Sequence, residues 1–187
     1  MIQKSVLFVF ILLAGFSSVL ADNNINITEK NIHFGRRTHE NRQIEAVIIH
    51  TTYNASGGNQ YDLHAILHQF SRYHVGAHYL IARDGQVYQL ISEKDIAFHA
   101  GKSVLPDGKG MVNSRSIGIE IMNNKLDTPT REQMIAATSL VKQIQKRLPI
   151  KYILRHSDIA PGRKTDPWNL NWEEFNEMIH PYNLGQK

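Results

Sequence analysis

Cysteine is absent from the 187-residue sequence. Disulfide bonds therefore cannot hold the domain together, and neither a thiolate nucleophile nor a thiolate metal ligand is available. The domain must rely on its hydrophobic core or on a bound metal for stability. Histidine and carboxylate side chains remain as metal ligands, and the sequence contains ten histidines.

A strong excess of one charge is also absent. The formal net charge is +4, from 21 Lys and Arg against 17 Asp and Glu. This mild bias lacks the basic striping of nucleic-acid-binding domains, so we expect no nucleic-acid partner. It suits an anionic polymer as partner, although ordinary solubility charge explains it equally well.

The apolar run at the N-terminus is short for a bilayer span. Lys4 precedes the uninterrupted apolar run Val6 to Leu13, and Val19-Leu20-Ala21 places small side chains at the positions that determine signal cleavage. This pattern predicts a secretory signal peptide over residues 1–21, cut after Ala21. We therefore expect an exported, periplasmic protein without stable membrane insertion after cleavage. An uncleaved membrane anchor is the alternative.

The remaining chain divides into a polar arm and a patterned domain. Residues 22–42 are rich in Asn and Arg, which predicts an irregular N-terminal arm. Residues 43–187 alternate apolar strand patterns with amphipathic helices, which predicts an α/β domain with a central mixed β-sheet flanked by helices. The expected strands are 46–49, 78–82, 86–91, 96–100, 116–122 and 151–154. The expected helices are one capped by Asp62 that runs to about Tyr73, one over 129–148 with Thr128 as cap, and a last one capped by Asn171.

Residues 155–167 form a loop that concentrates an imidazole, carboxylates and cations directly after an expected strand. His156 and Asp166 in this loop are nitrogen and oxygen donors that zinc accepts. His50 also stands at the end of an expected buried strand. If both strands belong to one sheet, the two imidazoles project from the same edge, and Asp166 can loop back as the third ligand.

A competing metal site is conceivable on the first expected helix. His64 and His68 are spaced i, i+4, so they share one helix face. The usual metalloprotease motif places Glu next to the first His, whereas Ala65 stands there. This pair remains an alternative to His50 and His156.

Two further charged residues, Glu120 and Lys164, each allow two interpretations. Glu120 interrupts the apolar alternation of strand 116–122, so it is either solvent-facing or functional. Beside a zinc-bound water it would act as general base and then as general acid. Lys164 either faces the same cavity, where it would stabilise an oxyanion, or is an ordinary surface lysine.

Five blocks in the right order resemble the zinc-dependent N-acetylmuramoyl-L-alanine amidases of the AmpD type, whose fold is shared with the peptidoglycan recognition proteins. Together they extend over about residues 44 to 170. The blocks are Val47-Ile48-Ile49-His50-Thr51-Thr52, Gly76-Ala77-His78-Tyr79-Leu80-Ile81 with Arg83-Asp84-Gly85, Ala97-Phe98-His99-Ala100-Gly101, Ser116-Ile117-Gly118-Ile119-Glu120 and His156 to Pro167.

The resemblance implies a zinc site and a reaction. It places zinc ligands at His50, His156 and Asp166, the acid/base carboxylate at Glu120 and a carbonyl-polarising cation at Lys164. It also implies substrate contacts near His99 and Ala160. Ala77 stands where phage members have tyrosine, which favours the AmpD-like branch, and the loop 101–115 matches the family poorly in detail.

The implied activity is hydrolysis of the amide bond between the lactyl group of N-acetylmuramic acid, or its 1,6-anhydro form, and L-alanine of the stem peptide. Peptidoglycan or its fragments would then be the substrate. Two alternatives remain open at this point. The same fold supports a peptidoglycan-binding module without catalysis, and a metallopeptidase would cut the stem peptide itself.

Overall fold

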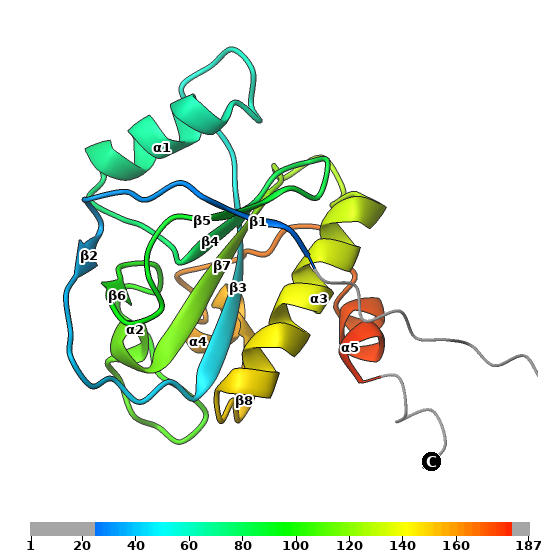
Figure 1. Ribbon diagram of the computed structural model, residues 1–187. Coiled ribbons are helices and arrows are strands. Elements are labelled where there is room, and N and C mark those ends of the chain that lie inside the picture. The colour runs from blue at the N-terminus through cyan, green and yellow to red at the C-terminus, as the bar shows by residue number, and fades with distance from the viewer. Residues whose placement is uncertain (1–24, 181–187) are drawn as a thin grey trace, which may run out of the picture.

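The computed structural model describes residues 25–180, so the predicted signal peptide lies outside the described residues. A six-stranded mixed sheet forms the centre, in the order β1-β5-β4-β7-β3-β8, and a two-stranded sheet pairs β2 with β6 (Figure 1). The strands are β1 (Ile27–Glu29), β2 (Arg36–Arg37), β3 (Ala46–Thr52), β4 (Tyr79–Ile81), β5 (Val87–Gln89), β6 (Ile96–Ala97), β7 (Ser116–Met122) and β8 (Tyr152–Arg155).

The middle of the sheet is parallel and buried on both faces. Strand β3 pairs in parallel with β7 on one side and with β8 on the other. All seven residues of β3 are buried, as expected for a parallel strand covered by helices. The strands that end near His50 and His156 therefore lie side by side in one sheet, as the sequence predicts.

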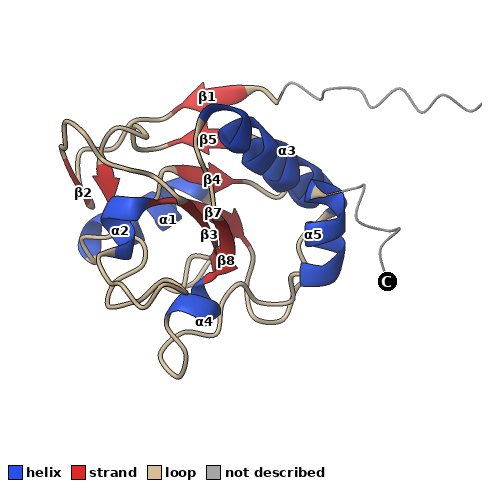
Figure 2. Ribbon diagram, turned by 90° about the horizontal axis from the view of Figure 1, so that it is seen from below, coloured by secondary structure: helices blue, strands red, loops and turns tan. Residues whose placement is uncertain are grey.

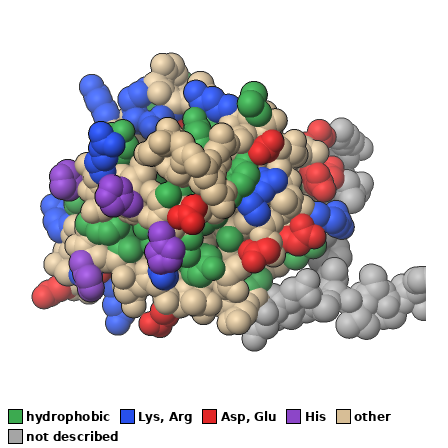
Figure 3. All heavy atoms as spheres, turned by 90° about the horizontal axis from the view of Figure 1, so that it is seen from above, with side chains coloured by type: hydrophobic (Ala, Val, Ile, Leu, Met, Phe, Trp, Pro, Cys, Tyr) green, Lys and Arg blue, Asp and Glu red, His purple; other side chains and the backbone are tan. Residues whose placement is uncertain are grey.

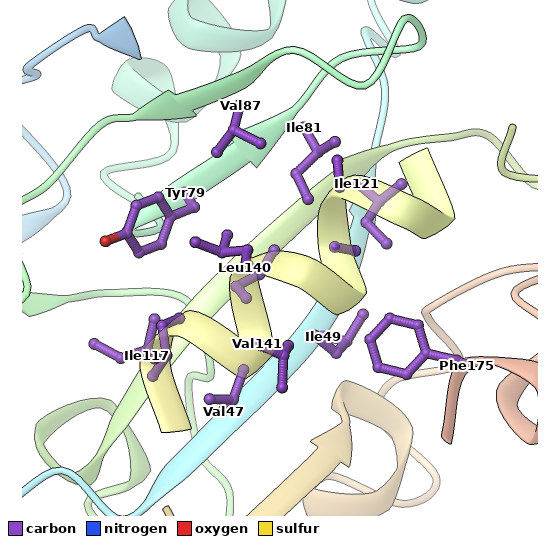
Figure 4. Packing of buried hydrophobic residues seen from close by; sticks show 14 of the residues in the cluster. Val47, Ile49, Tyr79, Ile81, Val87, Ile117, Ile121, Leu140, Val141 and Phe175 are labelled. Atoms are coloured by element: carbon purple, nitrogen blue, oxygen red, sulfur yellow. The ribbon is translucent and has the colours of Figure 1, made fainter. Parts of the chain in front are cut away.

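Helices cover both faces of this sheet (Figure 2). Strand residues that alternate along β3 and β7 pack on one face against α3 (Arg131–Arg147) and α5 (Trp172–Ile179), as Figure 4 shows for Val47, Ile49 and Ile117 beneath Leu140 and Val141. The opposite face is covered by α1 (Leu63–Arg72), α2 (Val112–Arg115) and α4 (His156–Ile159). The predicted α/β fold class is confirmed.

The predicted irregular arm is wrong for part of its length. Strand β1 pairs in parallel with β5 and forms the edge of the main sheet, while β2 pairs with β6. The side chains of β1 are half-buried or exposed. An edge strand of this kind is held by backbone hydrogen bonds and therefore leaves little hydrophobic pattern in the sequence.

The start of α3 also differs from the prediction. Thr130, not Thr128, caps the helix: its side chain accepts a hydrogen bond from the backbone N–H of Gln133, and the Gln133 side chain accepts one from the Thr130 N–H. This capping box satisfies two N–H groups that a lone cap at Thr128 would leave without helical partners. The predicted caps Asp62 and Asn171 are confirmed.

Charged side chains of both signs lie on the face in Figure 3, and the histidines visible there gather on its left side. Within residues 25–180, none of the helices combines the length and apolarity that crossing a bilayer requires.

Candidate functional site

A cavity of about 470 Å³ opens where β3 and β7 end and where the loop after α4 returns to the sheet. Its lining combines titratable side chains with aromatic ones. The titratable residues that line it include His99, Glu120, His156, Lys164 and Asp166.

Sheet register brings the central residues together. His50 lies directly opposite Glu120 in the parallel ladder of β3 and β7, so both side chains project from the same face. On the other side of β3, Ile49 pairs with Arg155, and the following position brings His50 next to His156. The chain then passes through α4 and a loop, and the backbone N–H of Ser157 donates to the carbonyl oxygen of Asp166, which returns that residue to the histidines.

His50, His156 and Asp166 form a compact buried cluster. Nδ1 of His50 lies 2.9 Å from Nδ1 of His156. Oδ2 of Asp166 lies 3.0 Å from the His156 nitrogen and 3.5 Å from the His50 nitrogen. The ligand atoms of a tetrahedral metal centre of this kind lie roughly 3.3 Å apart, so the three atoms have the spacing that a metal ion requires.

Hydrogen bonding supports this assignment for His156. Its Nε2 lies 3.2 Å from the carbonyl oxygen of Ala100, which can only accept, so Nε2 carries the proton. Nδ1, the other ring nitrogen, then faces His50 and Asp166. A cluster of lone pairs and a carboxylate suits a bound cation, and it is the one group of three or more possible protein ligands found between residues 25 and 180.

The electrostatic environment sets the protonation states of Asp166 and His50 in the cluster. Burial opposes ionisation of Asp166, but its contacts with His156 and His50 outweigh burial and hold the pKa of Asp166 well below its usual range. Burial lowers the pKa of His50 to about 4. At neutral pH the carboxylate is therefore charged and His50 is neutral, which is the protonation state that metal ligands need.

The surroundings of Glu120 raise the pKa of its carboxyl group, whereas those of Asp166 lower the pKa. It lines the cavity, but its Oε2 is inaccessible to solvent and has no hydrogen-bond partner among the described residues. Burial and the nearby Asp166 carboxylate raise the pKa of Glu120 to about 8, while the Lys164 ammonium opposes this rise. A carboxylate oxygen that is shut off from water and has no hydrogen-bond partner is costly, and such groups are typical of functional sites.

Some of the other predicted site residues line the cavity, and others do not. Lys164 and His99 line the cavity. Ala160 is buried at the end of α4, where its N–H donates to the carbonyl oxygen of His156, and it is not among the lining residues. The alternative pair His64 and His68 is exposed on α1 and has no third protein ligand within the described part of the chain.

Two of the aromatic residues that line the cavity form a contact pair that was not predicted from the sequence. Tyr53 and Trp168 meet edge to face with ring centroids 5.9 Å apart, and Nζ of Lys125 lies 5.4 Å from the centre of the Trp168 ring. Their signal in the sequence is position alone, because Tyr53 follows β3 directly and Trp168 comes two residues after Asp166.

A buried cluster of metal-ligand type beside a carboxyl group with one solvent-inaccessible oxygen, in a cavity at the end of parallel strands, is an arrangement typical of metal-dependent hydrolases. Comparison with known proteins specifies the family. Residues 40–169 match the family model described as N-acetylmuramoyl-L-alanine amidase, so the chain belongs to this family.

Individual relatives agree with the family match. The 1,6-anhydro-N-acetylmuramyl-L-alanine amidase AmpD of Enterobacter cloacae is 34% identical over 121 residues, which cover 63% of this chain and 64% of that protein. The chain thus spans somewhat less than two thirds of this relative.

Solved structures with muropeptide ligands share the fold. AmiD of Escherichia coli, in complex with anhydro-N-acetylmuramic acid-L-Ala-D-gamma-Glu-L-Lys, superposes with a TM-score of 0.64 at 28% identity over 76% of this chain and 60% of that one. AMPDH3 of Pseudomonas aeruginosa, in complex with anhydromuramic pentapeptide, gives a TM-score of 0.63 at 30% identity over 76% of this chain and 63% of that one.

Proposed function

We propose that the protein is a zinc-dependent amidase that hydrolyses the bond between the lactyl group of N-acetylmuramic acid, or of its 1,6-anhydro form, and L-alanine of the stem peptide. The observation that carries the proposal is the convergence of His50, His156 and Asp166 beside Glu120, in a chain of this family. Peptidoglycan or muropeptides would be the substrate.

Zinc fits the three ligands. Two imidazole nitrogens and one carboxylate oxygen suit zinc, and three protein ligands are typical of catalytic rather than structural zinc sites. When bound, zinc supplies Lewis acidity, which lowers the pKa of a water molecule and polarises a carbonyl oxygen.

Glu120 is the residue that moves the proton. A carboxyl group whose pKa lies near neutrality can both accept and return a proton at physiological pH. Glu120 takes a proton from the water that attacks the lactyl carbonyl carbon. It then gives the proton to the alanine nitrogen as the C–N bond breaks, which leaves a carboxylic acid on the sugar and a free amine on the peptide.

Lys164 supplies a positive charge at the cavity wall. Its ammonium group is close enough to Glu120 and His50 to affect their pKa values. During attack, negative charge develops on the carbonyl oxygen, and a fixed cation in the cavity stabilises it. Tyr53 and Trp168 add apolar surface on which the sugar or the peptide can rest.

We further propose that residues 1–21 are a cleaved signal peptide and that the enzyme acts in the periplasm. The pattern of Lys4, the apolar run and the small residues before Ala21 supports this. Strand β1 pairs with β5, which supports treating the described part of the arm, residues 25–42, as part of the same folded domain as residues 43–180. Detection of the protein only in the cytosol, with its N-terminus intact, would contradict export.

Digestion of purified peptidoglycan and of anhydro-muropeptides, read by mass spectrometry, tests the activity. We expect free stem peptides that begin with L-Ala, lost with a chelator, restored by zinc and absent with Glu120→Gln. Peptides cut within the stem would indicate the metallopeptidase instead. Tight binding without cleavage under every zinc condition would indicate a recognition module.

A further inference from the structure

The second ring nitrogen of His50 has a partner of its own. Nε2 of His50 lies 3.0 Å from Nδ1 of His99, and the two rings meet edge to face with centroids 5.0 Å apart. On its other side, Nε2 of His99 lies 3.2 Å from the hydroxyl oxygen of Ser116. His99 therefore connects His50 to the first residue of β7.

The Ser116 hydroxyl group determines which atom donates in each of these hydrogen bonds. The Ser116 hydroxyl lies 2.6 Å from the carbonyl oxygen of Val112, which can only accept, so the hydroxyl proton points there. The Ser116 oxygen then accepts from Nε2–H of His99. A neutral imidazole carries one N–H, so Nδ1 of His99 accepts, and His50 must donate its Nε2–H.

We propose that His99, held by Ser116, is a positioning residue that keeps His50 in its Nε2–H form, so that the Nδ1 lone pair faces His156 and Asp166. This inference rests on the proposed function in one respect, namely that His50 is a metal ligand. It assigns His99 a role in orienting the metal ligand, in addition to its place in the cavity wall.

The surroundings of His99 are shaped to hold its ring. The side-chain oxygen of Asn113 accepts from the backbone N–H groups of both His99 and Ala100. Gly118 lies under the ring, where an added Cβ would come within 2.4 Å of Cγ of His99. A side chain at position 118 would thus displace the ring from Ser116 and His50.

Two successive residues then orient both histidine ligands. The side chain of His99 accepts from Nε2–H of His50, and the carbonyl oxygen of Ala100 accepts from Nε2–H of His156. In each ligand the hydrogen bond at Nε2 leaves Nδ1 free for the metal. Partners of this kind typically change metal affinity about 10- to 100-fold when they are removed.

A matched pair of substitutions separates this role from simple packing. Asn and Leu have nearly the same shape, but the Asn side-chain oxygen can replace Nδ1 as acceptor. We expect His99→Leu to weaken zinc binding about 10- to 100-fold and His99→Asn to recover most of the loss. Binding is measured on the metal-free protein by competition with a chromogenic chelator. Equal losses in both variants, or no loss in either, would overturn the proposal.

Nuclear magnetic resonance of the imidazole nitrogens gives a second readout without metal or substrate. We expect Nε2–H forms of both His50 and His99 in the metal-free protein, and a mixture of forms at His99 in Ser116→Ala. A His50 ring protonated at Nδ1 alone would overturn the proposal. Failure to cleave peptidoglycan would contradict the proposed function and leave both of these measurements unaffected.

Discussion

At the residue scale, the site contains two carboxyl groups with opposite tendencies. Asp166 is held ionised by its contacts with His156 and His50, whereas burial and the charge of Asp166 raise the pKa of Glu120 to about 8. In the proposed mechanism, this divergence separates a metal ligand, Asp166, from an acid/base group, Glu120. We infer these two proposed roles from the environment of each carboxyl group rather than from its residue type.

The raised pKa of Glu120 predicts a pH-dependent loss of stability in the metal-free protein. The folded state binds a proton more tightly than the unfolded state, so the free energy of unfolding falls as pH rises from about 4.5 to about 8. Glu120→Gln removes this loss. We expect it to stabilise the metal-free protein by a few kcal/mol, on the order of 1–4, at pH 8 and to change little at pH 4.

Urea denaturation of the metal-free protein at both pH values measures this difference. Glu177→Gln, at an exposed position on α5, is the matched control and should have the same small effect at both. Equal stabilisation by Glu120→Gln at pH 4 and pH 8 would show that ionisation of Glu120 does not lower the free energy of unfolding as predicted.

Lys164 is expected to affect the reaction but not metal binding, because it lines the cavity without belonging to the His–His–Asp cluster. Lys164→Met should lower kcat about 10²- to 10³-fold, and Lys164→Arg should retain part of the activity. Zinc affinity should change little in both. Initial rates on an anhydro-muropeptide, measured beside zinc titrations, test this. Unchanged kcat in Lys164→Met would mean that the lysine is an ordinary surface residue.

At the element scale, α3 depends on its capping box and on the face that it buries. Its buried residues, among them Leu140 and Val141, pack on the strands that carry His50 and Glu120 (Figure 4). Fraying of the first turn would loosen the contact of Gln133 with the carbonyl oxygens of β4 and β7. The start of α3 therefore contributes to the rigidity of the sheet beneath the site.

Thr130→Ala should destabilise the protein by about 1 kcal/mol or somewhat more, because the Thr130 hydroxyl also donates to the carbonyl oxygen of Arg83. Thr128→Ala is the matched control at the position that the sequence pattern favours. We expect its effect to stay within roughly 0.5 kcal/mol. Urea denaturation compares the two, and a larger loss for Thr128→Ala would contradict the observed helix start.

At the scale of the whole molecule, the proposed metal site connects segments that are far apart in the chain. His50 belongs to β3, His156 begins α4 after β8, and Asp166 lies in the loop beyond it. A bound metal would tie the central strand to its neighbour and to this loop. Metal binding should therefore stabilise the entire domain.

Zinc at about 100 times its dissociation constant should add roughly 2.7 kcal/mol of stability. For a chain of this size that corresponds to a rise in Tm of roughly 5–10 °C. Thermal unfolding with zinc, with magnesium and with chelator measures the effect. Magnesium prefers oxygen ligands and should add little. Equal stabilisation by both metals, or none by zinc, would contradict the site.

Much of the fold was predictable because it depends on local pattern. The alternation of Ile117, Ile119 and Ile121 indicated β7, and the Asp62 and Asn171 caps marked two helix starts correctly. Strand β1 was missed because its side chains are largely exposed and its backbone hydrogen bonds are invisible in the sequence. The start of α3 was misplaced because Thr128 and Thr130 both suit a cap, and only the contact with Gln133 distinguishes them.

The sequence by itself determined which chemical groups are present: no thiol, histidine and carboxylate as possible ligands, and one glutamate within an apolar strand. Only the tertiary structure decided which of them meet. His50 and His156 are separated by 106 positions in the chain, and the parallel register of β3, β7 and β8 brings them together beside Glu120. The same register sets Glu120, whose Oε2 is inaccessible to solvent, opposite His50, and His99 lies between His50 and Ser116. Proton affinity and ring orientation depend on such neighbours, which are distant in sequence and close only in the folded chain.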